Sequence, residues 1–233
     1  MGTKTEMKNM GIEIMEDAEQ IESIKIYLNC IEEIKSRLLG IDYFLKNTFL
    51  NEKITIECSI LQLRKVLELI SLAAIAPNKT KYKEFRLSAD EQKDFRKDYN
   101  GRKILEMLKK INPYFYPRPL MQPIINSNGT KHLDAFTGDY LSMKIYASIY
   151  DKCGKLLHAD NPWDDKKSYK EFGGKIPNII NQIKNLLNLH SIIIMQNKKT
   201  ICWIIELGDK NNLAKGHIAN ADGLVFIDNN YYQ

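Results

Sequence analysis

Three charged residues share one face of an otherwise apolar segment in the first third of the chain. Glu57, Arg64 and Glu68 are seven and four positions apart, a spacing that places their side chains on one side of a helix. A guanidinium in such a helix needs carboxylate partners, because an isolated charge removed from water is costly. The pattern favours a structural ion-pair seam and leaves open an anion site in which Arg64 stabilises phosphate charge.

A second polar group surrounds the end of another predicted helix. Tyr150 and His158 are eight positions apart and so share a helix face, with Cys153 and Lys155 between them. A neutral His accepts protons near neutral pH, and Lys155 would favour that neutral form while attracting phosphate. A His in the last helical turn is also a common cap for terminal carbonyls, so a structural role for His158 stays open.

The sequence predicts neither a metal site nor a cofactor site. Cys153 with His158, or His158 with Asp160, supplies two ligand types without the repeated spacing of a structural zinc site. The glycine-rich loops that bind nucleotides and the Ser- and His-based hydrolase motifs do not occur in the sequence. The sequence therefore lacks the usual signatures of NTPases, dinucleotide enzymes, serine hydrolases and zinc proteases.

The composition is that of one ordinary globular protein. The 233 residues carry 34 Lys and Arg against 29 Asp and Glu, a formal net charge of +5, and 44% are hydrophobic. No apolar run approaches the roughly 20 residues of a membrane span. The four cysteines form no CxxC pair. We therefore expect a protein of the reducing cytoplasm, without membrane association and without a disulfide framework.

Apolar periodicity predicts an α+β fold that is predominantly a helical bundle. Intervals of three and four positions are typical of amphipathic helices, and a β-branched and aromatic pattern replaces them near residue 191. The predicted helices span 21–40, 55–76, 88–97, 101–111, 139–161 and 177–190. The predicted strands span 192–195, 200–207, 213–219 and 224–227 and form a hairpin or small antiparallel meander. We expect the bundle, 1–190, and the meander, 191–233, to pack as one globular unit.

A segment rich in proline and aromatic residues, 112–123, follows the fourth predicted helix. Its four prolines favour extended backbone, and Tyr114, Phe115 and Tyr116 supply rings that can pack on the bundle. We predict a rigid strap rather than a ligand site. Trp163 and Trp203 are predicted to be core residues rather than stacking platforms.

Basic and aromatic residues alternate in the middle third of the chain. The basic members are Lys81, Lys83, Arg86, Lys93, Arg96, Lys97, Arg102, Lys103, Lys109 and Lys110, and the aromatic members are Tyr82, Phe85, Phe95 and Tyr99. Such a mixture can neutralise phosphates and stack on unpaired bases. Because acidic residues are also frequent there, a solvated helix face is the simpler interpretation.

Three phrases of the sequence resemble a family of uncharacterised bacterial proteins. They are Leu61–Lys65 with Glu68, Asn112–Pro119 and Cys153–Pro162, within a resemblance that covers roughly residues 20 to 165. The helical layout is also similar to that of HEPN proteins, helical bundles of toxin and antiviral systems that are often metal-independent RNases. The resemblance implies an Arg that holds phosphate charge and a His that moves a proton.

The HEPN signature, an Arg and a His separated by four to six residues on one helix, does not occur in this sequence. After Arg64 the corresponding positions are Leu69, Ile70 and Ser71. The two residues of such a site could converge only across helices, as Arg64 and His158.

Two functions remain as hypotheses. The first is a cytoplasmic helical binding module of a bacterial defence or toxin-like system, which binds nucleic acid, RNA in preference, or a partner protein. The second is a metal-independent RNase in which Arg64 and His158 act with support from Tyr150, Lys155 or Glu68. An open edge of the C-terminal meander could also pair with a second copy in a homodimer.

Overall fold

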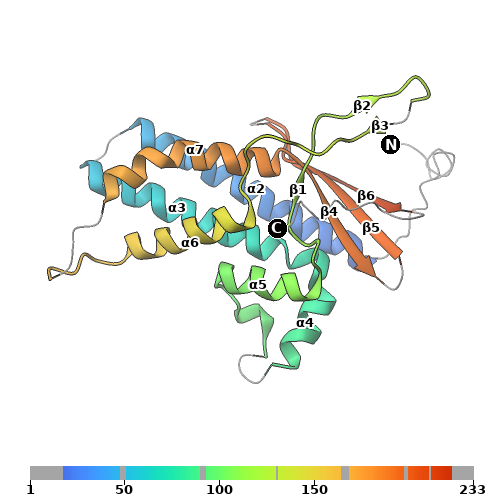
Figure 1. The fold of residues 1–233 in the computed structure, drawn as a ribbon, viewed down its shortest axis with the longest axis horizontal. Helices are drawn as coiled ribbons and strands as arrows, with labels where there is room; N and C mark the ends of the chain where they lie inside the picture. The colour runs from blue at the N-terminus through green and yellow to red at the C-terminus, as the bar shows by residue number, and fades with distance from the viewer. Residues whose placement is uncertain are drawn as a thin grey trace.

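The long helices of the protein lie side by side in one bundle. The computed structural model describes residues 18–47, 51–89, 93–129, 131–163, 168–196, 199–209 and 211–221. The bundle contains α2 (Ala18–Lys46), α3 (Glu52–Ala73), α6 (Met143–Leu157) and α7 (Tyr169–Leu187), as Figure 1 shows. α3 contacts α2, α6 and α7, and Ile60, Leu63 and Leu67 are completely buried. The prediction of a helix surrounded by others is confirmed.

Two shorter helices pack below the bundle in the view of Figure 1. They are α4 (Lys79–Leu87) and α5 (Gly101–Ile111), with the 3₁₀ turns η1 (Ala76–Asn78) and η2 (Phe95–Lys97) before each of them. α5 begins as predicted, because the Asn100 side chain accepts a hydrogen bond from the Lys103 amide at 3.1 Å. This cap fixes where α5 starts against α6.

The helix predicted at 88–97 is wrong. Ser88 ends α4 instead of opening a helix, and the described part of the segment forms only the turn η2. The reason is a set of half-buried contacts: Tyr82 donates its hydroxyl to Asp98 at 3.0 Å, and Arg86 forms an ion pair with Asp98 at 3.0 Å. These contacts hold α4 in place and withdraw Tyr82 and Arg86 from the basic and aromatic surface expected from the sequence.

α7 begins eight residues before Pro177, the position predicted to start it. Tyr169, Phe172 and Ile176 are buried at helical spacing, and this apolar stripe outweighs the backbone hydrogen bond that proline cannot make. Gly173 lies one turn before the proline, and a Cβ there would be only 3.0 Å from the Ile56 side chain. The missing side chain lets α7 pack closely against α3.

The C-terminal strands form an antiparallel sheet, and the fold class is α+β as predicted. β4 (Leu189–Gln196), β5 (Lys199–Glu206) and β6 (Lys215–Ala221) follow one another, and β1 (Arg118–Pro119) pairs with β4 on its other side. The division expected at residue 190 therefore falls within β4. The strand predicted at 224–227 lies outside the described residues. β2 (Ile124–Ile125) and β3 (Lys131–His132) form a separate ladder that projects beyond the sheet in Figure 1.

The segment 112–123 packs as the predicted strap. Phe115 and Tyr116 are buried, and Tyr116 donates its hydroxyl to the Leu141 carbonyl at 2.8 Å. Pro119 lies in β1 at the edge of the sheet, where the lack of an amide hydrogen is tolerated. The strap therefore connects the bundle to the sheet.

A buried pair of amide side chains fixes the start of the strap. The Asn112 amide group donates to the Asn78 side-chain oxygen at 3.0 Å and to the Ile193 carbonyl at 2.8 Å. Asn78 in turn donates to the Ala74 carbonyl at 3.1 Å. Because a buried polar group without a partner is costly, this chain of bonds specifies how α3, the strap and β4 meet.

The sheet and α2 meet at a buried aromatic cluster. Trp203 is completely buried, as predicted, and its ring contacts Tyr27 edge-on with centroids 6.1 Å apart. The Tyr27 hydroxyl is 2.7 Å from His190 Nε2, and His190 Nδ1 is 3.0 Å from the Leu187 carbonyl oxygen. A carbonyl only accepts, so Nδ1 carries the proton and Tyr27 donates to Nε2. Burial lowers the pKa of this neutral His190 to about 4.

The lowered pKa predicts an acid-sensitive fold. His190 takes up a proton near pH 6.5 in the unfolded chain but only near pH 4 in the folded protein. The stability that depends on neutral His190 is therefore fully present above pH 6.5 and is lost as the pH falls from 6.5 to 4. The loss amounts to roughly 3 kcal/mol in the free energy of unfolding. Urea unfolding at several pH values measures it.

The matched variants for this experiment are His190→Asn and His217→Asn. Asn at position 190 can donate to the Leu187 carbonyl but does not titrate, so the pH dependence between 6.5 and 4 should flatten. His217 is exposed on β6, and its replacement should leave the wild-type pH dependence unchanged. An unchanged pH dependence in His190→Asn would contradict the assignment.

Candidate functional site

Arg64 lies between α3 and α6 and contacts both helices. Its Nε donates to Glu68 Oε1 at 2.9 Å, and its Nη1 donates to the Tyr150 carbonyl at 2.7 Å. The guanidinium carbon is 3.3 Å from the centroid of the Tyr150 ring, a cation–π contact. The Arg64–Glu68 half of the predicted ion-pair seam is confirmed, and only 21% of the Arg64 side chain is exposed.

The face of α6 that is turned toward Arg64 carries Tyr146, Tyr150 and Gly154, which are four positions apart. The Tyr146 and Tyr150 rings stack with centroids 5.8 Å apart and an interplanar angle of 9°. At the next position, Gly154, a Cβ would be 3.0 Å from Arg64 Nη1. The Tyr150 hydroxyl accepts a hydrogen bond from the Gly101 amide at 3.0 Å. Arg64 and the two tyrosines therefore join α3, α6 and the start of α5.

Glu57 belongs to a different group of contacts from Arg64. It lies 4.0 Å from Lys53 Nζ, and Lys53 forms an ion pair with Asp160 at 2.7 Å. The Tyr169 hydroxyl is 3.2 Å from the other Asp160 oxygen. The predicted seam of three charges is thus divided, with Glu57 placed near the turn that follows α6.

His158 and Lys155 lie at the exposed end of α6. His158 occupies the C-cap position directly after that helix, where its backbone is extended, and its role as a side-chain cap stays a prediction. Lys155 is exposed in the last turn. Within the described part of the chain, the contacts of Arg64 do not include His158. Convergence of Arg64 and His158 in one active site stays a prediction.

The remaining chemistry near this turn is limited. Cys153 is buried, and burial raises the pKa of its thiol to about 12, so a thiolate nucleophile is not available near neutral pH. Trp163 is 91% exposed, and its predicted core position is wrong. The chain turns outward after α6 at Asn161, whose side chain accepts a hydrogen bond from the Trp163 amide. The turn keeps the indole of Trp163 away from the core.

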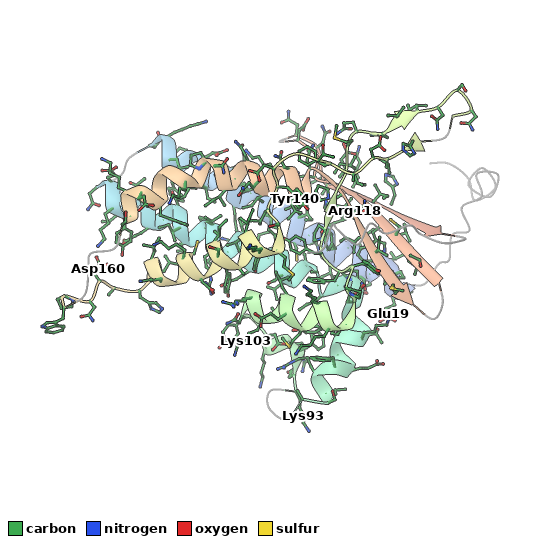
Figure 2. All side chains as sticks on the ribbon, viewed as in Figure 1. Glu19, Lys93, Lys103, Arg118, Tyr140 and Asp160 are labelled. Carbon is green, nitrogen blue, oxygen red and sulfur yellow. The ribbon has the colours of Figure 1, made fainter. Side chains whose placement is uncertain are left out.

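A cavity of about 270 Å³ lies at the other end of α6. Its walls come from α5, from the strap and from the first turns of α6. Figure 2 shows the two regions at opposite ends of the helix, with Tyr140 near the cavity end and Asp160 beyond the His158 end. Nine of the fourteen lining residues are apolar or aromatic, including Phe115, Tyr116 and Tyr146.

The polar residues of the cavity are mostly cations. Arg102 forms ion pairs with Glu106 at 3.1 Å and with Asp151 at 2.5 Å, so its charge is offset. Lys109 and Lys144 also line the cavity, both are exposed, and neither is paired with a carboxylate among the described residues. The lining therefore combines an apolar interior with two cations available to an anionic ligand.

The sequence did not indicate this cavity. The strap was predicted to pack and not to bind, and Lys144, Tyr140 and Ser142 were not among the candidate residues. Lys109 was one member of the basic cluster, but only the fold brings it near Lys144 of another helix. A lysine in the first turn of a helix is unfavourable for the helix dipole, and Lys144 in the first turn of α6 is the local signal that could have drawn attention to it.

The described residues show neither a cluster of metal ligands nor a membrane-spanning helix. No group of three or more His, Cys, Asp or Glu side chains there is arranged to hold a metal ion. None of the helices in the described ranges is long and apolar enough to cross a membrane.

Comparison with known proteins leaves the function to be argued from the site. No protein-family model matches the chain, and neither a curated protein nor a solved structure shows significant similarity to it. The resemblance to HEPN proteins therefore stays a prediction.

The contacts of Arg64 predict a large structural effect of its removal. Arg64→Ala should lower the free energy of unfolding by about 2–4 kcal/mol, because Glu68 and the Tyr150 carbonyl lose a charged donor in a half-buried position. Arg64→Lys should recover only part of this loss, since an ammonium cannot reproduce the planar fork and the ring stack. Urea unfolding measures both effects.

The control is Lys65→Ala, at the neighbouring exposed position. We expect this change to remain within about 0.5 kcal/mol of the wild type. If Arg64→Ala were as stable as Lys65→Ala, the contacts between α3 and α6 would not be structural, and Arg64 would return as a candidate functional residue.

Proposed function

We propose that the protein is a nucleic-acid-binding module whose binding surface centres on the cavity between α5, the strap and α6. The observation that carries the proposal is an apolar, aromatic cavity whose lining also includes Lys109 and Lys144, neither of which has a carboxylate partner among the described residues. Proteins bind unpaired strands by neutralising phosphates and stacking bases, and this site offers groups for both.

α5 extends the positive surface beyond the cavity. Lys103 and Lys110 are exposed on this helix, and Figure 2 shows Lys103 near the start of α5. The Asn100 cap and the bond from Gly101 to Tyr150 hold the start of α5 in place. A strand crossing the cavity could therefore find further cations along a rigid helix.

The nature of the partner is proposed partly from the resemblance stated above. RNA is favoured over DNA, and a bacterial cytoplasmic defence or toxin-like system is the setting, because HEPN proteins occur in such systems. The alternative, a metal-independent RNase, would need Arg64 at a phosphate. Binding without turnover is the better supported proposal because Arg64 is already bonded to Glu68 and stacked on Tyr150.

Charge reversal at the cavity tests the proposed function. Lys109→Glu and Lys144→Glu should each weaken the binding of a single-stranded RNA by about tenfold at low salt, and should lower the slope of log K against log salt by about 1. Fluorescence anisotropy with a labelled strand of about 12 nucleotides measures both quantities. EDTA is present throughout, so that metal-dependent contaminants do not cleave the probe.

The matched control is Lys25→Glu, which changes the charge equally at an exposed position of α2 outside the cavity. This variant should bind RNA nearly as the wild type does. Equal weakening in all three variants would indicate only a nonspecific effect of net charge and would refute a site at the cavity. Cleavage of the strand in EDTA that disappears in His158→Ala would instead support the nuclease alternative.

A further inference from the structure

We infer that the cavity between α5, the strap and α6 accommodates one unpaired nucleobase, with the adjoining phosphate held by Lys109 and Lys144. This inference rests on the proposed function and specifies which part of the nucleic acid the site binds. The ligand chemistry is a nucleobase that carries a phosphate, and its source is either a nucleotide within an RNA strand or a free nucleotide.

The size of the cavity selects a small ligand. Its volume of about 270 Å³ is close to the lower end of small-molecule sites, which begin at roughly 300 Å³. A dinucleotide or a base pair would exceed this space, whereas one base is a flat, compact group. The phosphate and ribose would then lie outside the apolar interior, where the exposed lysines are.

The walls of the cavity suit an aromatic ligand. Tyr140 and Met143 are half-buried, so part of their surface is open to a ligand, whereas Phe115, Tyr116 and Tyr146 are buried and form the packed part of the wall. Stacking on aromatic rings tolerates any base, because every base has a π face. Burial raises the pKa of Tyr116 and of Tyr146, so their hydroxyls stay protonated and neutral.

The walls are also held in place before any ligand binds. Tyr116 donates to the Leu141 carbonyl, Tyr146 donates to the Leu67 carbonyl at 2.8 Å, and the Leu141 amide donates to the Gln182 carbonyl at 3.0 Å. A preformed site does not need to order its side chains on binding, which lowers the entropic cost of association.

The charges of the lining residues favour Lys109 and Lys144 as the partners of the phosphate. Glu106 is the one carboxylate among the fourteen lining residues, and Arg102 pairs with it, so Lys109 and Lys144 remain as the cations for an anion. α6 begins at the cavity wall with Ser142 as its cap, and the positive end of the helix dipole adds to the field of the two lysines.

Calorimetric titration of the full chain with AMP, adenosine and ribose 5-phosphate tests the inference. AMP should bind more tightly than either fragment, because only AMP fills the apolar space and reaches the lysines. Lys109→Gln and Lys144→Gln should weaken AMP binding while leaving adenosine binding unchanged. Both positions are exposed, so these variants should fold like the wild type.

A cavity-filling variant provides the second arm. Ala147 lines the cavity, and Ala147→Leu should weaken both AMP and single-stranded RNA by about 5- to 150-fold, the equivalent of one lost base stack. Ser148→Leu is the matched control, because it adds the same side chain at the next, exposed position of α6, which does not line the cavity. Its affinity for AMP and for RNA should stay at the wild-type value.

The outcomes separate the two proposals. Equal affinity for AMP and ribose 5-phosphate would overturn the inference about the base, and AMP binding unchanged in the Gln variants would overturn the assignment of the phosphate to Lys109 and Lys144. If RNA binding depends on Lys109 and Lys144 while AMP does not bind, the base is not seated in the cavity, but the proposed function stands. If AMP binds as expected and RNA does not, the ligand is a free nucleotide and the proposed function fails. Absence of both kinds of binding overturns both proposals.

Discussion

A guanidinium that lies between two helices must find partners on both, and Arg64 imposes this requirement on the bundle. Glu68 comes from the same helix, but the other contacts must come from α6, which supplies the Tyr150 carbonyl and the face of the Tyr150 ring. At Gly154 any side chain would crowd the guanidinium. The rotation and the position of α6 against α3 are thereby fixed, because sliding α6 by one turn would remove all of these contacts together.

The position of α6 in turn creates the cavity. The ring of Tyr150 stacks on Arg64, and the hydroxyl of the same residue accepts a hydrogen bond from the Gly101 amide, the first of α5. One side chain therefore sets the distance between α5 and α6. Tyr146 stacks on Tyr150 and lines the cavity one helical turn earlier. Between the two helices the strap completes the wall with Phe115 and Tyr116. The candidate site thus depends on the contacts that the Arg64 guanidinium makes in the bundle, and no sequence motif marks the site.

This origin explains which features could be predicted from the sequence. α3, α5 and the β4–β5 hairpin carry their signals locally, in apolar periodicity, an Asn cap and β-branched runs, and these predictions are confirmed. The segment 88–97 is determined by the contacts of Asp98 with Tyr82 and Arg86, and the start of α7 by its packing against Ile56 of α3, so the local signals at 88–97 and Pro177 were misleading. Arg64 and Glu68 could be paired from their spacing, whereas the cavity draws its residues from three separate segments and has no period or motif to reveal it.

Two buried groups of the protein, Cys153 and His190, have pKa values far from neutrality. A general acid or base is most effective when its pKa is near the working pH. Burial has the opposite effect on Cys153, whose pKa it raises to about 12, and on His190, whose pKa it lowers to about 4. The fourteen residues that line the cavity include neither His nor Cys. The selectivity of the proposed site for a phosphate and a ring would therefore come from shape and charge.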